Sequence, residues 1–194
     1  MRSLRFDGWI AGIGTRSGTR MVLGHWRGSP FGPFSDVVVE EPDGHRPPLA
    51  PTRRIADLVA ATHVFDEVRV VPVRVTGRRD GHVSAPPLDL RFSTGRRNLT
   101  GLALRAVPGP LATRPGRLAL WDRPARLLLR ARTHATARAG RHQWYDARDL
   151  HPVVSAKAVH EGRSLGGLAP VEPPVRLGSG SAPALPASYA SRPP

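Results

Sequence analysis

The sequence contains no cysteine, and lysine occurs once, as Lys157, among 29 basic residues. Disulfides, thiol nucleophiles and cysteine-ligated metal sites are therefore excluded. A mechanism that needs a lysine imine must use Lys157. No apolar run approaches the ~20 residues that span a bilayer, and the N-terminal region has no secretory core. We therefore expect a cytoplasmic protein with no membrane partner.

Internal repeats are also missing, and low-complexity sequence is limited to the C-terminal end. The 20 glycines and 21 prolines stay below the ~25–30% that marks low-complexity chains. Leu, Ile, Val and Phe exceed the ~20% below which charged chains stay disordered. These proportions predict one globular β-rich domain over residues 1–181. Alanine, proline and serine dominate residues 182–194, which predicts a disordered tail.

Alternating apolar residues in the N-terminal third predict β-strands. Leu4, Phe6 and Ile10 share one face of the first strand, and Trp9 lies on the other. Segments 21–26 and 35–40 are the next strands.

Two turns are predicted between these strands, at residues 15–18 and 41–44. The glycines at Gly12, Gly14 and Gly18 superficially resemble a dinucleotide-binding loop. That loop requires a following helix, whereas a strand-like segment follows here. We interpret the glycines as part of a hairpin.

An amphipathic helix is predicted over residues 52–66, because apolar side chains recur at helical spacing after the potential N-cap Thr52. A second short helix is predicted over 98–107. Residues 68–75 read as a strand in which Pro72 favours an edge or a bulge. The remaining strand candidates are 88–92, 117–121, 124–130, 141–145 and 153–160. The predicted fold class is α+β, mostly β, as an antiparallel sheet or β-barrel with these two helices.

The net charge of +14 is uneven along the chain, since Arg114–Arg148 contains nine arginines and two aspartates. Aromatic residues interleave with the arginines, a mixture that stacks bases and holds phosphates. The candidate nucleic-acid residues are Arg123, Arg126, Arg130, Arg138, Arg141, Trp144 and Tyr145. The alternative is a solvated strand face with its aromatic residues in the core.

The sequence gives little indication of a metal site or a cofactor-binding motif. The eight histidines form no H-x-H or H-E-x-x-H pair. Asp146, Asp149 and His151 lie close enough in sequence for a hard-metal site, but the two aspartates also suit turn or capping positions. No metal or cofactor is predicted.

The segment Ser29–Val39, with sequence SPFGPFSDVVV, resembles the acetoacetate decarboxylase-like superfamily, in which a Ser-Pro-x-Gly-Pro-aromatic loop precedes a barrel strand. The resemblance implies a β-barrel-like fold around a pocket for small organic acids or ketones, often in oligomers. Enzymes of this superfamily use a lysine in a Gly-x-Pro-Lys context beyond this strand. The corresponding residues 52–68 contain no lysine, and Lys157 lacks the glycine and proline.

Three functional hypotheses remain. The leading one is a non-covalent binding protein for a small organic acid, held by arginine, whose planar fork suits carboxylates. The rival is a nucleic-acid-associated protein that uses Arg114–Arg148. The third is an enzyme, through histidine or aspartate acid–base chemistry or through Lys157 as a nucleophile.

Overall fold

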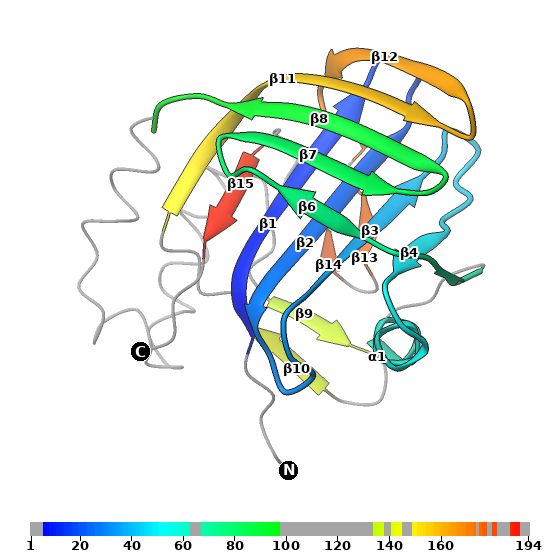
Figure 1. Ribbon diagram of the computed structural model, residues 1–194, viewed down its shortest axis with the longest axis vertical. Helices are drawn as coiled ribbons and strands as arrows, with labels where there is room; N and C mark the ends of the chain where they lie inside the picture. The colour runs from blue at the N-terminus through cyan, green and yellow to red at the C-terminus, as the bar shows by residue number, and fades with distance from the viewer. Residues whose placement is uncertain are drawn as a thin grey trace.

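The structure, a computed structural model, describes residues 6–62, 67–97, 134–137, 141–144, 149–173, 175–177, 180–181 and 187–190. Eleven strands form one curled sheet, so the mostly β fold class is confirmed (Figure 1). The main path of the sheet runs β5-β4-β3-β2-β1-β12-β11-β8-β7-β6, and β15 pairs with both β1 and β11.

The first half of the sheet is built from β1 Asp7–Thr15, β2 Arg20–Gly28, β3 Phe34–Glu40, β4 Pro48–Ala50 and β5 Arg69–Val70. The second half contains β6 Arg74–Thr76, β7 Asp80–Ala85, β8 Leu88–Thr94, β11 Asp149–His160, β12 Arg163–Ala169 and β15 Ala187–Ala190. Two separate hairpins pair β9 His134–Ala137 with β10 Arg141–Trp144, and β13 Arg176–Leu177 with β14 Gly180–Ser181.

The helix α1, Arg53–Thr62, explains why the sheet is mixed rather than purely antiparallel. It connects β4 to β5, which pair in parallel, and parallel neighbours need such a crossover. Thr52 caps the helix, accepting a hydrogen bond at Oγ1 from the Ile55 amide (3.3 Å). Ile55 and Val59 are buried, as the amphipathic pattern predicts. The predicted helix 52–66 is thus confirmed as far as Thr62, and residues 63–66 lie outside the described ranges.

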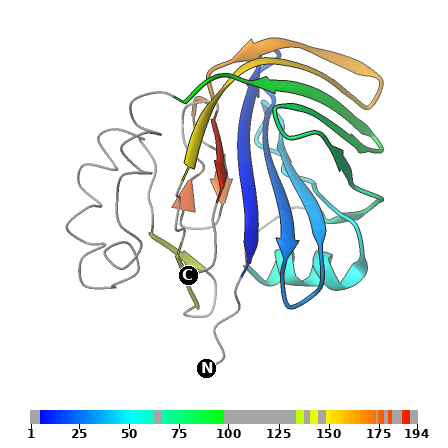
Figure 2. The same ribbon diagram turned by 60° about the vertical axis from the view of Figure 1, so that its left-hand side comes forward.

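The two edge strands of the sheet, β5 and β6, are neighbours in the sequence. Only residues 71–73 separate them, so the edges lie within about 15 Å along the chain at full extension. This short link requires the sheet to curl into a half-barrel. Figure 2 shows β7, β8, β11 and β12 passing over one end of β1–β3, with α1 at the other end. The single strand predicted over residues 68–75 is wrong, because Arg69–Val70 and Arg74–Thr76 are two separate strands with Pro72 between them. Both lie at edges of the sheet, as the proline favours.

The main hydrophobic core lies on the concave side of the curled sheet, which we call the inner face. It combines alternate residues of β1, β2 and β3 with residues of β7, β8 and β11. Trp9 packs against this core, whereas Ile10 packs against a smaller cluster on the outer face. The predicted first strand is therefore confirmed, but both of its faces carry buried apolar groups. The two predicted turns are also confirmed, by amide-to-carbonyl hydrogen bonds from Gly18 to Thr15 (3.0 Å) and from Gly44 to Glu41 (2.9 Å).

The structure describes four residues of the C-terminal segment 182–194, for which a disordered tail is predicted. These residues, Ala187–Ala190, form β15 between β1 and β11. Small side chains bury little apolar surface, but backbone hydrogen bonds to two neighbouring strands order this segment. The predicted helix 98–107 and the strands 117–121 and 124–130 lie outside the described residues. Among the described residues, no helix is long and apolar enough to cross a membrane.

Candidate functional site

One register row of the inner face carries polar side chains. Antiparallel pairing aligns Ser35 with His25, His25 with Trp9, and Trp9 with Ala190. Ala190 in turn aligns with Asp149. Directly opposed residues of an antiparallel pair point to the same face. We call Ser35, His25, Trp9 and Asp149 the inner row.

The next row of the same face is apolar. It contains Leu49, Val37, Leu23 and Ala11, each with 0% of its surface exposed. Apolar residues on the concave side of a sheet are expected, whereas polar ones are informative. The inner row is therefore the candidate functional site.

Ser35 and His25 form a hydrogen-bonded pair at one end of the inner row. The Ser35 Oγ and the His25 Nδ1 are 2.8 Å apart. Burial lowers the pKa of His25, and the nearby charge of Arg27 lowers it further. The imidazole is therefore mainly neutral at pH 7, and within the described residues its Nε2 has no hydrogen-bond partner. A neutral imidazole can donate or accept one further hydrogen bond.

Trp9 supplies an aromatic wall beside this pair. Its ring centroid lies 5.1 Å from that of His25 and 6.2 Å from that of Phe92. Phe92 belongs to β8, so the two aromatic rings meet across the concave side. Trp9 itself is half-buried. An apolar wall next to a few directed polar groups is typical of small-molecule sites.

Asp149 and Arg97 form the other end of the site. Arg97 donates through Nε and Nη2 to the two Asp149 carboxylate oxygens, at 2.6 and 2.7 Å. These hydrogen bonds lower the pKa of Asp149 to about 2. His151 donates from Nδ1 to the Gly95 carbonyl (3.0 Å), and its Nε2 lies 3.5 Å from Asp149. The Arg97 guanidinium keeps Nη1 outside the bidentate pair.

A cleft of about 430 Å³ lies elsewhere, at the β1–β2 hairpin. It is lined by Thr15, Arg16, Gly18, Arg20, Ala169, Pro170 and Glu172. Arg20 is buried, and it already donates to Glu40 (3.2 Å) and to the Pro173 carbonyl (2.6 Å). Glu172 and Glu40 offset the charges of Arg16 and Arg20. The cleft therefore has little net positive charge with which to attract an anion, although two arginines line it.

The structure locates some of the predicted site residues. Lys157 has an exposed side chain on β11, between the buried Ala156 and Ala158, so it points away from the inner face. Arg141 and Trp144 lie in β10, whose backbone alone is described. The other nucleic-acid candidates, Arg123, Arg126, Arg130, Arg138 and Tyr145, lie outside the described residues.

The possible hard-metal set is only partly described. Asp149 and His151 approach each other, but Arg97 occupies both carboxylate oxygens of Asp149. Asp146 lies outside the described residues. Within the ranges that are described, no three potential metal-ligating side chains converge.

Sequence analysis did not single out His25 or Ser35. The sequence holds one indication that His25 faces the core. It alternates with Met21 and Leu23 in the predicted strand and so lies on the same face as these apolar residues. Comparison of the chain with models of protein families, with curated proteins and with solved structures finds no match.

Proposed function

We propose that this protein binds a small organic acid non-covalently at the inner row. The observation that carries the proposal is a row with polar side chains, of which His25 and Asp149 are partly exposed, next to a row that is apolar and fully buried. The polar groups are hydrogen-bonded to one another, but apolar side chains at these positions would bury more apolar surface, as the neighbouring row does. A ligand with matching polar groups can form hydrogen bonds with these side chains.

Each end of such a ligand has a chemical match. Asp149 holds the Nε and Nη2 of Arg97 and so orients the guanidinium. The Nη1, which makes no hydrogen bond within the described residues, can bind a carboxylate. The neutral His25 suits a carbonyl or hydroxyl group. Trp9 suits the carbon chain between them.

The positions of β2 and β11 in the sheet set the length of the ligand. From His25 to Asp149 the row crosses three strand spacings, or roughly 14 Å measured along the sheet. A ligand that contacts both ends of the row at once spans this distance less the reach of the side chains at each end.

The likeness of Ser29–Val39 to the acetoacetate decarboxylase-like superfamily supports the choice of ligand. That segment leads into β3 and contains Ser35. The outward position of Lys157 supports non-covalent binding, because an exposed amine lacks the desolvation that helps a lysine attack a carbonyl.

Calorimetric titration with short-chain monocarboxylic acids, each compared with its primary amide, tests the proposal. We expect the acids to bind at least about tenfold more tightly than the amides, since a charge-assisted hydrogen bond contributes ~1.5–3 kcal/mol. The double variant Arg97→Gln/Asp149→Asn should lose this preference while leaving no buried charge unpaired.

Arg91→Gln is the matched control, because Arg91 is an exposed arginine on the outer face of β8. It should bind the acids as the unmodified protein does. If no acid saturates the protein, or if the double variant binds acids unchanged, the proposal is wrong.

A further inference from the structure

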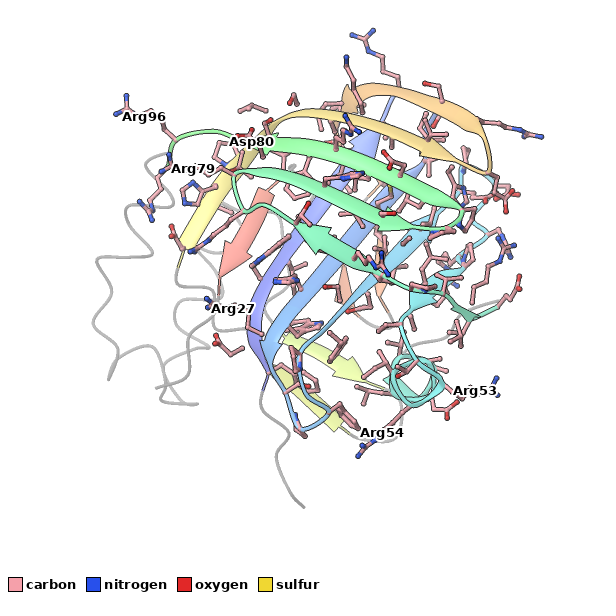
Figure 3. The ribbon with its side chains drawn as sticks, viewed as in Figure 1. Arg27, Arg53, Arg54, Arg79, Asp80 and Arg96 are labelled. Carbon is pink, nitrogen blue, oxygen red and sulfur yellow. The ribbon has the colours of Figure 1, made fainter. Side chains whose placement is uncertain are left out.

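Three exposed arginines gather at one end of the β7–β8 hairpin. Arg78 and Arg79 lie in the turn between β6 and β7, and Arg96 follows the end of β8. Within the described residues, none of the three has an ion-pair partner. Figure 3 shows Arg79 and Arg96 together at this end, extending away from the sheet. We call Arg78, Arg79 and Arg96 the arginine corner.

Backbone hydrogen bonds fix the corner. The Thr94 amide donates to the Arg79 carbonyl at 2.8 Å, which joins the turn to the end of β8. The turn itself requires glycine at position 77, where φ is +72° and a Cβ would collide with the Asp80 carbonyl oxygen. The two arginine-bearing segments are therefore held side by side before any partner arrives.

Arg96 and Arg97 are consecutive but differ in exposure and pairing. The Gly95 amide donates to the Pro152 carbonyl at 2.8 Å and anchors the chain just before them. Arg97 then pairs with Asp149, whereas Arg96 is exposed. Among the residues that the structure describes, the acidic side chain beside Arg79 is that of Asp80, which accepts a hydrogen bond from Ser93 (2.7 Å). Positive charge therefore exceeds negative charge at the corner.

We infer that the arginine corner binds the phosphodiester backbone of duplex nucleic acid. The guanidinium fork suits phosphate oxygens, and an exposed, unenclosed corner fits a long polyanion better than a small ligand. The described residues of the corner include no aromatic side chain on which a base could stack, so the contact is with the backbone and does not depend on sequence. The net charge of +14 favours association with a polyanion.

The inference is separate from organic-acid binding, and it differs from the hypothesis based on Arg114–Arg148. The inference rests on Arg78, Arg79 and Arg96, whose side chains the structure describes. The corner lies close in sequence to that basic stretch, since the chain continues from Arg97 toward it.

Fluorescence anisotropy with labelled duplex DNA and duplex RNA of unrelated sequence, over a series of salt concentrations, tests the inference. We expect log K to fall linearly with log[salt] for both duplexes. Arg79→Gln/Arg96→Gln should reduce the slope for DNA by about 1.8, because each lost phosphate contact removes ~0.9. Arg79→Lys/Arg96→Lys should keep most of the slope, because the charge is retained.

The matched control is Arg53→Gln/Arg54→Gln, which removes the same charge from α1 on the opposite side of the molecule (Figure 3). It should leave the slope nearly unchanged. The inference is overturned if neither duplex binds at the lowest salt, or if the two Gln double variants lower the slope equally. It is also overturned if vesicles of anionic lipid bind as tightly as the duplexes do.

Discussion

The two neighbouring rows of the inner face differ in kind although they lie on the same strands. On β2 and β3, Leu23 faces Val37, and the next inward pair is His25 with Ser35. The first pair is fully buried among apolar groups. The second is hydrogen-bonded, and its histidine is partly exposed. Within two residues along each strand, the inner face changes from a packed core to a polar surface.

The two rows therefore contribute differently to the stability of the sheet. Burial of Leu23 and Val37 removes apolar surface from water, which stabilises the sheet at roughly 25 cal/mol per Å². The His25–Ser35 hydrogen bond adds only ~0.5–1.5 kcal/mol net. Substitutions in the apolar row should therefore affect folding, and those in the inner row should affect binding.

The largest expected effect is that of Leu23→Ala, compared with Ser35→Ala two positions along the paired strand. Leu23→Ala leaves a cavity in a closed core and should lower the free energy of unfolding by about 2–5 kcal/mol. Ser35→Ala should lower it by less than about 1.5 kcal/mol, since it removes one hydrogen bond. Urea denaturation followed by circular dichroism measures both. Equal losses in the two variants would show that the inner row is as structural as its neighbour.

A smaller effect is expected from Asp36, which lies next to Ser35 but on the outer face. Burial raises the pKa of Asp36 to about 6, although Trp26 donates a hydrogen bond to its carboxylate (2.9 Å). The folded pKa exceeds the unfolded value of 3.8. The stabilising contribution is therefore complete below pH 3.8 and is lost as the pH rises through about 6.

Asp36→Asn keeps an acceptor for Trp26 and removes the partly buried charge. At pH 8 we expect the variant to be more stable than the unmodified protein by about 1–3 kcal/mol, and the difference should vanish near pH 4. Asp149 behaves in the opposite way, because its folded pKa of about 2 makes its contribution complete above 3.8 and lost below about 2. Thermal unfolding across this pH range measures the effect. A gain that does not vary with pH would contradict it.

The smallest expected effect concerns His25. Arg27→Gln removes the second cause of its lowered pKa and leaves burial, the larger cause, in place. The pKa of His25 should therefore rise toward 6.5 without reaching it. NMR titration of the imidazole Hε1 follows the change, with Arg91→Gln as a control that should not shift it. An unchanged pKa in Arg27→Gln would mean that burial alone sets the protonation of the inner row.

Local sequence signals predicted the elements whose causes are local. The Thr52 cap with its apolar stripe predicted the helix, and alternation predicted β1 and β8. Strand segments were also predicted at β2, β3 and β11. The predicted turns at residues 15–18 and 41–44 are present for the same reason. Seven strands were not predicted, namely β4, β7, β9, β12, β13, β14 and β15. Proline obscures β4, Pro48–Ala50, and small residues obscure β15, Ala187–Ala190.

The inner row was not predictable, because it depends on pairing between distant segments. β1 lies beside β15 and β12, which come more than 140 residues later in the sequence. No local pattern specifies that Asp149 aligns with Trp9 through Ala190. The proximity of Asp149 and His151 was predicted from their spacing, but the pairing of Asp149 with Arg97 was not.

The short link between β5 and β6 also bears on how copies of this protein behave at high concentration. Strand edges with open amide and carbonyl groups recruit foreign strands and seed aggregates. Here both edges are very short, at two and three residues, and Pro72 between them lacks an amide hydrogen. The edges formed by β5 and β6 therefore present almost no template for β-pairing with another copy, which disfavours aggregation through these edges.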